Sequence, residues 1–252
     1  MTDRPRTRLY IEGDLAAGAA VECGRDQAHY LAHVLRLAPG DPVALFNGRD
    51  GEWLAHIDAV GKKSAVLAVG RQLRPQAPEP DLWLVFAPVK RAPLDFLVQK
   101  ATELGVSALM PAITRRTVVE RIKRERMEAN AIEAAEQCER LTLPRVDDAR
   151  ALSQILDSWP PERRILLCAE AGTAAPINEF LRECDPGEPW AVLTGPEGGF
   201  EQTELDLLHK FPNVSAVGLG PRILRADTAA LAALSCWQAV LGDWRDRPPG
   251  RN

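Results

Sequence analysis

The sequence predicts an α/β protein in which a mostly parallel, helix-covered sheet follows a small β-barrel. Evenly spaced strand-like segments with one short helix fill the first 73 residues. Beyond residue 80, apolar runs alternate with segments of helical periodicity. Between these regions the proline-rich stretch "RPQAPEP", 74–80, lacks apolar periodicity and is typical of a linker. We therefore expect two domains, at residues 1–73 and 81–252.

The N-terminal region is expected to form strands that end at turn residues. The candidate strands are "RLYIEG", "AAVEC", "DPVALFNG", "EWLAHIDAVG" and "SAVLAVGRQL". Apolar residues at helical spacing across "RDQAHYLAHVLRL", 25–37, followed by a Pro-Gly stop, predict one helix. Strands of this kind around a single short helix favour a small β-barrel.

The C-terminal region is expected to alternate strands and helices. "LWLVFAPV", 82–89, is continuously apolar, as a parallel strand buried on both faces requires. The other predicted strands cover 106–114, 164–171, 188–196 and 214–220. The predicted helices cover 92–105, 124–141, 151–159, 201–211 and 227–244. Ligands of such sheets bind at the carboxyl ends of the strands.

Composition is that of a soluble globular protein, with 46% hydrophobic and 26% charged residues and a net charge of −4. No apolar run approaches the roughly 20 residues that span a bilayer, and the N-terminus has no apolar signal core, so a cytoplasmic location is expected. The five cysteines are scattered and are interpreted as reduced. His29 and His33 lack an evident third ligand, so no metal site is expected.

Two stretches are locally basic despite the negative net charge, and both are candidates for RNA contact. The first is the N-terminal arm with Arg4, Arg6 and Arg8. The second, "TRRTVVERIKRER", contains Arg115, Arg116, Arg121 and Arg124. The alternative for the second stretch is a solvated helix face whose arginines pair with Glu120 and Glu125.

Two glycine-proline turns each follow a predicted strand and precede a predicted helix. They are "LTGPEGGF", 193–200, and "VGLGPRILRADTA", 217–229. Glycine-rich turns in this position usually cradle phosphate, but neither contains G-x-x-x-x-G-K-[ST] or G-x-G-x-x-G. Glycine also allows backbone groups to approach a ligand closely, and proline fixes the turn.

These turns, together with "KATELGV" and "EAAEQCER", resemble the RsmE family of ribosomal RNA methyltransferases in the SPOUT superfamily. The resemblance extends to "HYLAHVLRLAPGDPVALFNG", which is similar to that family's PUA-like RNA-binding barrel. It implies a deep trefoil knot in the C-terminal domain, a homodimer, S-adenosylmethionine as cofactor, and methylation of N3 of a uridine in 16S rRNA of the small ribosomal subunit. The cofactor site would comprise Leu193, Thr194, Gly195, Pro196 and Gly198 from the first turn and Leu219, Gly220, Ile223 and Leu224 from the second.

Methyl transfer to a ring nitrogen depends on positioning and on loss of the N3 proton. Arg225 is the first candidate for stabilising the resulting anion, and Glu197 for holding the base or relaying its proton. Glu197 could equally complement a helix dipole. Arg140 could face the substrate or a partner subunit, or form a surface salt bridge. Glu136 and Gln137 could be helix-surface pairs, and an intrahelical pair explains Lys100 and Glu103.

One departure from the family concerns the start of the last helix. The family usually has L-R-T-E-T-A where this chain has Leu224 to Ala229 as "LRADTA". Asp227 and Thr228 could still cap the helix, but a direct catalytic role for that carboxylate is in doubt. Two further functions stay open: a noncatalytic RNA-binding assembly factor, and a methyltransferase acting on tRNA or on ribose 2′-O.

Overall fold

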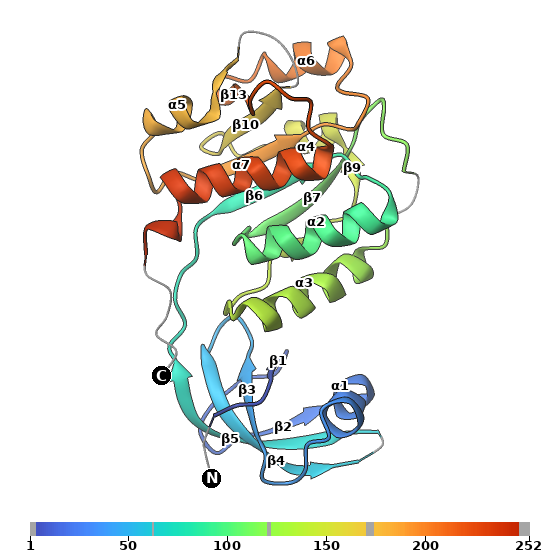
Figure 1. The fold of residues 1–252 in the computed structure, drawn as a ribbon, viewed down its shortest axis with the longest axis vertical. Helices are drawn as coiled ribbons and strands as arrows, with labels where there is room; N and C mark the ends of the chain where they lie inside the picture. Colours follow the sequence, from blue (N-terminus) through green and yellow to red (C-terminus); the bar gives the residue numbers. More distant parts are fainter. Residues whose placement is uncertain (1–3, 62, 120–121, 170–173, 247–252) are drawn as a thin grey trace. The chain divides into compact units, whose positions relative to one another are not determined.

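The computed structural model describes residues 4–61, 63–119, 122–169 and 174–246 (Figure 1). The chain divides into two compact units. The first comprises residues 1–78 with 135–143, and the second comprises residues 79–134 with 144–252. The expected boundaries, 1–73 and 81–252, did not place 135–143 with the N-terminal unit.

The first unit is built on one five-stranded sheet in the order β1-β3-β4-β5-β2. Its strands are β1 (Arg8–Tyr10), β2 (Ala20–Cys23), β3 (Pro42–Phe46), β4 (Glu52–Val60) and β5 (Ala65–Arg74). β1 pairs parallel with β3 and the other pairs are antiparallel. All five lie where the sequence predicted them. β1 and β2 form the two ends of this sheet and, among the described residues, do not pair with each other.

The predicted helix at 25–37 has two parts. α1 (Arg25–His29) is α-helical, and Tyr30–Val34 forms a π-helical turn closed by the Leu35 N–H donating to the Tyr30 carbonyl at 3.0 Å. The wider turn rotates part of the apolar face outward. Leu31 is buried, whereas Val34 is 58% exposed.

Residues 135–143, which include the end of α3 (Arg124–Cys138), belong to the first unit because guanidinium groups bind their carbonyls. Arg8 donates to the carbonyls of Ala135 and Arg140 at 2.7 and 3.0 Å. Arg74 donates to the carbonyl of Glu139 at 2.7 Å. The last carbonyls of a helix lack intrahelical partners and carry partial negative charge, so these cations satisfy them.

The second unit contains a parallel sheet in the order β11-β13-β10-β12-β6-β7-β8, with β9 paired to β7. Its strands are β6 (Leu82–Phe86), β7 (Ala108–Ile113), β8 (Arg145–Val146), β9 (Arg150–Ala151), β10 (Arg164–Ala169), β11 (Ala175–Pro176), β12 (Trp190–Thr194) and β13 (Val214–Gly218). All of these pairings are parallel. The predicted fold class, a mostly parallel α/β sheet preceded by a small β domain, is confirmed.

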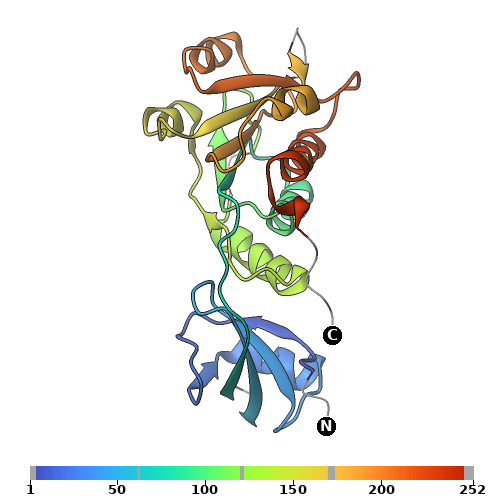
Figure 2. The same cartoon turned by 90° about the vertical axis from the view of Figure 1, so that its left-hand side faces the viewer.

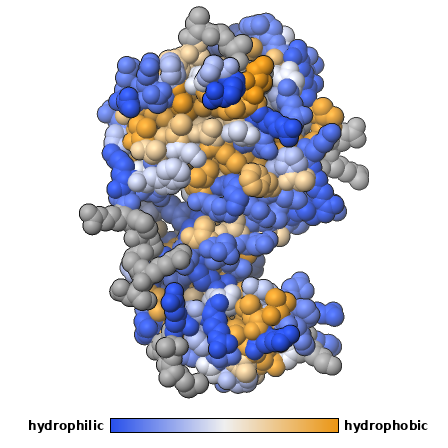
Figure 3. Space-filling view, in the orientation of Figure 1, coloured by the Kyte–Doolittle hydropathy of each residue, from blue (hydrophilic) through white to orange (hydrophobic). Residues whose placement is uncertain are grey.

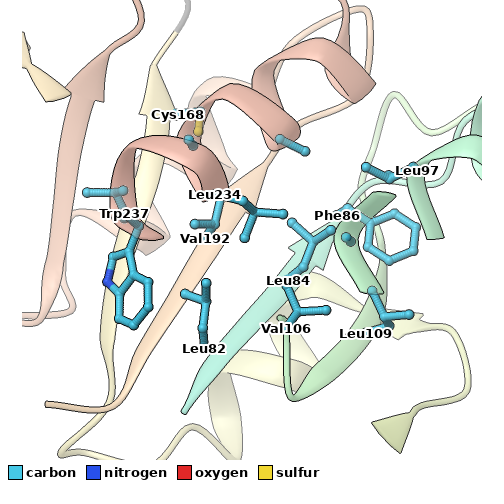
Figure 4. Packing of buried hydrophobic residues seen from close by; sticks show 14 of the residues in the cluster. Leu82, Leu84, Phe86, Leu97, Val106, Leu109, Cys168, Val192, Leu234 and Trp237 are labelled. Atoms are coloured by element: carbon cyan, nitrogen blue, oxygen red, sulfur yellow. The ribbon is translucent and has the colours of Figure 1, made fainter. Parts of the chain in front are cut away.

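Helices cover both faces of this sheet, and Figure 2 shows α2 and α7 on the side opposite α4 and α6. The helices are α2 (Arg91–Glu103), α4 (Leu152–Asp157), α5 (Ile177–Arg182), α6 (Gln202–Leu208) and α7 (Ala226–Val240), followed by a 3-10 turn at Asp243–Arg245. Alternate residues of β6 enter the two cores. Leu82, Leu84 and Phe86 pack with α2 and α7 (Figure 4), and Val85 packs with α4 and α6. Burying one such side chain contributes roughly 1.5–3 kcal/mol.

The strand order positions a ligand site. β10 lies between β12 and β13, so the carboxyl ends of these three strands are adjacent. Both glycine-proline turns leave the sheet at this edge, after Thr194 and after Gly218. None of the helices in the described part of the chain is long and apolar enough to span a membrane.

Candidate active site

An open pocket of about 470 Å³ lies at the carboxyl ends of β10, β12 and β13. Its lining comes from the ends of these strands, from both glycine-proline turns and from the start of α7. The lining residues are Cys168, Ala169, Thr194, Gly195, Leu219, Gly220, Arg222, Ile223, Leu224, Ala226 and Ala229.

The first turn needs glycine for steric reasons. A Cβ on Gly195 would lie 2.7 Å from the ring of Phe200, so any other residue there would force that ring to shift. Gly199 has a φ of +69° and its N–H donates to the Pro196 carbonyl at 2.8 Å, which closes the turn. Glu197 lies exposed in this turn, whereas Thr194 is 2% exposed at the end of β12.

The second turn combines a left-handed glycine with exposed side chains. Gly220 has a φ of +97°, which a residue with a side chain rarely adopts. Ile223 is 88% exposed although it lines the pocket. α7 starts directly after this turn with Arg225 as its N-cap, and the small residues Ala226 and Ala229 leave space along its first turn. Arg225 makes no side-chain capping hydrogen bond, whereas the Asp227 carboxylate accepts the N–H of Thr228 at 2.8 Å within the first turn of the helix.

The pocket lining is mostly apolar or glycine, with the Cys168 thiol and the Thr194 hydroxyl as polar groups. Burial, with a smaller effect of Cys236, raises the pKa of the Cys168 thiol to about 12, so this thiol stays protonated at neutral pH. Arg222 is the cationic side chain among the lining residues. Among the described residues no cluster of His, Cys, Asp or Glu side chains could hold a metal ion.

The structure brings six of the residues predicted for the cofactor site together around this pocket. They are Thr194, Gly195, Leu219, Gly220, Ile223 and Leu224. Leu193 packs in the core between β12 and α6, and Pro196 and Gly198 do not line the pocket. Sequence reasoning missed Cys168, Ala169, Arg222, Ala226 and Ala229. β10 lies between the two strands that lead into the turns, so its last residues line the pocket. The strand order would have been the signal for predicting them.

The catalytic candidates lie in different surroundings. Glu197 and Arg225 are exposed side chains of the two turns that leave this edge of the sheet. Arg140 belongs to the first unit, where its Nη2 donates to Thr142 Oγ1 at 3.0 Å. The Glu136 carboxylate accepts the Tyr10 N–H at 2.9 Å. The intrahelical pair expected for Lys100 and Glu103 is present at 2.6 Å.

The predicted RNA-contacting arginines also differ in exposure. Arg4, Arg6 and Arg115 are exposed, whereas the Arg8 side chain is 10% exposed and occupied by intramolecular hydrogen bonds. Arg124 forms an i,i+4 ion pair with Glu128 at 2.8 Å. The alternative of a solvated helix face predicted such pairing, but with Glu120 and Glu125 as the partners. Arg116 donates to the Gly198 carbonyl. Arg121 lies outside the described residues.

Fold and pocket together define an α/β domain that binds a small ligand where parallel strands end, connected to a small β domain. Residues 76–238 match the family described as RNA methyltransferase domain, and residues 23–69 match the RNA methyltransferase PUA domain. The chain therefore belongs to this RNA methyltransferase family, and the resemblance to its RsmE members is confirmed by the relatives below.

Several relatives share one name, ribosomal RNA small subunit methyltransferase E. The protein of that name from Rickettsia conorii is 35% identical over 234 residues, which is 90% of this chain and 93% of the relative. The one from Synechocystis sp. is 32% identical over 93% of this chain and 78% of its own length. The crystal structure of the Neisseria gonorrhoeae protein, bound to S-adenosyl methionine, has a TM-score of 0.83 at 28% identity and covers 94% of this chain and 99% of that chain.

Proposed function

We propose that this protein transfers the methyl group of S-adenosylmethionine to N3 of a uridine in 16S rRNA of the small ribosomal subunit. The observation that carries the proposal is the pocket bounded by both glycine-proline turns, in a chain whose relatives are small-subunit rRNA methyltransferases. One of these relatives was crystallised with S-adenosyl methionine bound. The names of these relatives disfavour a noncatalytic assembly factor and a tRNA target, and the product analysis described below separates uracil N3 from ribose 2′-O.

The residues present fit S-adenosylmethionine. Gly195 and Gly220 let backbone N–H and carbonyl groups approach the adenine and ribose. Arg222 supplies a cation for the carboxylate of the methionine moiety. When bound, the cofactor supplies an electrophilic methyl group on a positively charged sulfur. The raised pKa of Cys168 keeps a competing thiolate nucleophile out of the pocket.

The protein's catalytic contribution is positioning and stabilisation of charge. Loss of the N3 proton leaves a uracil anion, and the exposed guanidinium of Arg225, at the start of α7, can stabilise it. The α7 N-terminus adds its dipole to the same end. Glu197, exposed in the first turn, can hold the base by accepting its N3–H and can relay that proton. Arg140 remains a candidate substrate contact from the first unit.

The proposal includes a homodimer, a cytoplasmic location and a knotted C-terminal domain. Partly exposed apolar residues on α7, among them Leu231 and Val240, support the dimer. Figure 3 shows hydrophobic residues gathered on the surface where α7 and α2 lie in Figure 1. Contact with rRNA comes from the small β domain, the arm with Arg4 and Arg6, and exposed arginines such as Arg115 and Arg124.

The test is methyl transfer from labelled S-adenosylmethionine to small ribosomal subunits that lack the modification, with the product nucleoside identified by mass spectrometry. A 3-methyluridine product supports the proposal. A 2′-O-methylated product, or transfer only to tRNA, would replace the proposed target. Cofactor binding without transfer to any RNA would contradict the proposed activity and favour the assembly factor.

A further inference from the structure

Two turns at the carboxyl edge of the second sheet are connected by side-chain contacts. The first is the glycine-proline turn at 195–199, one end of which lines the pocket. The other, at 114–117, follows β7 and is closed by Thr117, whose N–H donates to the Thr114 carbonyl at 3.1 Å and whose Oγ1 accepts the Thr114 N–H at 2.9 Å. Thr114 is 6% exposed, so this turn is anchored in the sheet.

Arg116 makes the central contact between these turns. Its Nη1 donates to the Gly198 carbonyl at 2.7 Å, and its Nε lies 4.0 Å from Glu201 Oε1. The aliphatic part of the side chain packs over Gly198, since a Cβ built there would lie 3.5 Å from Arg116 Cδ. Arg116 therefore contacts the turn at 195–199 in two ways: its guanidinium forms a hydrogen bond, and its aliphatic side chain packs against the backbone.

Glu204 reinforces the same connection from α6. Its Oε2 accepts the Glu201 N–H at 2.9 Å, which caps the helix, and its Oε1 accepts the backbone N–H of Arg115 at 2.9 Å. The glycine-proline turn is thus bracketed: Arg116 fixes its tip, and Glu204 fixes the helix start that follows it. Charge-assisted hydrogen bonds of this kind are stronger than neutral ones.

We propose that Arg116 is a positioning residue for S-adenosylmethionine binding, which holds the turn at 195–199 in the conformation that forms the pocket. The inference rests on the proposed function, because it assumes the cofactor occupies that pocket. Sequence reasoning assigned Arg116 to RNA contact together with Arg115. Its side chain is 51% exposed, so contact with an RNA phosphate is the competing interpretation. If Arg116 positions the turn, its loss weakens cofactor binding without RNA; if it only contacts phosphate, that binding is unchanged.

Arg115 provides a matched control. It is exposed and adjacent, and substitution by alanine removes the same charge while keeping the backbone N–H that donates to Glu204. The experiment compares the wild-type protein, R116A, R116K and R115A by calorimetric titration with S-adenosylmethionine in the absence of RNA. We expect the Kd to rise about tenfold in R116A, since one charge-assisted hydrogen bond and its packing are lost. R115A should keep the wild-type Kd.

R116K separates positioning from charge. A lysine keeps the positive charge for RNA but not the planar group that reaches the Gly198 carbonyl over a packed stem. R116K should therefore weaken cofactor binding while retaining RNA affinity. At saturating cofactor, kcat of R116A should stay within about threefold of wild type while its KM for S-adenosylmethionine rises about tenfold. Thermal unfolding of each variant checks that the fold is retained.

The experiment distinguishes failure of the Arg116 inference from failure of the proposed function. Equal cofactor Kd values for the wild type, R116A and R115A would overturn this inference and leave the proposed function intact. Weaker RNA binding in R116A with an unchanged cofactor Kd would assign Arg116 to phosphate contact instead. Absence of cofactor binding by the wild-type protein would overturn both.

Discussion

Glu52 and Arg8 form an ion pair in which Oε1 and Nε are 2.5 Å apart and the side chains are 9% and 10% exposed. The second oxygen of the same carboxylate accepts from Arg74 Nε at 2.8 Å. Both arginines also donate to carbonyls of residues 135–140. One buried carboxylate thus holds the two cations that bind the end of α3.

Replacing Glu52 by glutamine should strongly destabilise the protein. The substitution leaves two guanidinium groups in a buried site without their counter-charge, and breaking one partner of such a group costs about 3 kcal/mol or more. Denaturant unfolding would measure this as a lower midpoint at unchanged slope. Glu22→Gln, on the exposed side of β2, is the matched control and should change stability by less than about 0.5 kcal/mol. Equal midpoints for the two variants would contradict the buried-triad interpretation.

The same carboxylate should make stability depend on pH. Burial alone raises the pKa of Glu52, but the hydrogen bonds and charges of Arg74 and Arg8 outweigh it, so the net pKa lies below the ordinary value of 4.5. A depressed folded-state pKa gives stability that is present above 4.5 and is lost as the pH falls through the folded-state pKa. The difference in unfolding free energy between wild type and E52Q should therefore shrink as the pH falls below 4.5. A difference that stays constant through that range would refute the linkage.

The sequence predicted the elements of the fold well because each has a local cause. Continuous apolar runs predicted the buried strands, and the spacing of Leu94, Leu97 and Val98 predicted α2 and the face it buries. What could not be predicted depends on distant partners. The carbonyls of residues 135–140 belong to the first unit because of Arg8 and Arg74, and no local pattern near 135 contains that information.

The site could be predicted only in part for the same reason. Gly195 and Gly220 are visible in the sequence because their turns require glycine. Ala169 was missed because its role follows from β10 lying between β12 and β13, an order set by packing of the whole sheet. Arg116 was grouped with other arginines by composition, although its contact with Gly198 joins segments 82 residues apart in the chain.

Gly220→Ala should weaken S-adenosylmethionine binding. An alanine is strained at a φ of +97°, so the second turn would shift away from its pocket-lining position at a cost of about 1 kcal/mol or more, which is a rise in Kd of about fivefold or more. Gly187→Ala is the control, because Gly187 has a φ of +94° with no atom near its missing Cβ and lies outside the pocket. Both variants should lose similar stability, and G220A should lose cofactor affinity in addition. Equal S-adenosylmethionine Kd values for G220A and G187A would show that Gly220 does not contribute to the cofactor site.

Arg225→Ala should lower the rate of transfer without changing cofactor affinity. The N-cap of α7 uses the backbone of Arg225, whose carbonyl accepts the Ala229 N–H at 2.8 Å, so the helix start is retained. Removing a group that stabilises developing charge typically costs about 100-fold in kcat. Single-turnover methyl transfer at saturating cofactor measures it. A normal rate with weaker cofactor binding would move Arg225 from catalysis to cofactor binding, the role proposed for the pocket-lining Arg222.

Arg124→Glu should weaken binding to small ribosomal subunits while leaving S-adenosylmethionine affinity intact. Arg124 is exposed on α3, its partner Glu128 lies on the same helix, and a phosphate could compete for the guanidinium. Loss of one phosphate contact should reduce the slope of log affinity against log salt by about 1. Arg182→Glu, an equal charge change at an exposed position of α5, is the control and should keep the wild-type slope. Wild-type affinity of the Arg124 variant at moderate salt would favour the alternative in which this arginine serves only in ion pairing along the helix face. An ion pair of that kind contributes a few tenths of a kcal/mol to stability and nothing to RNA recognition.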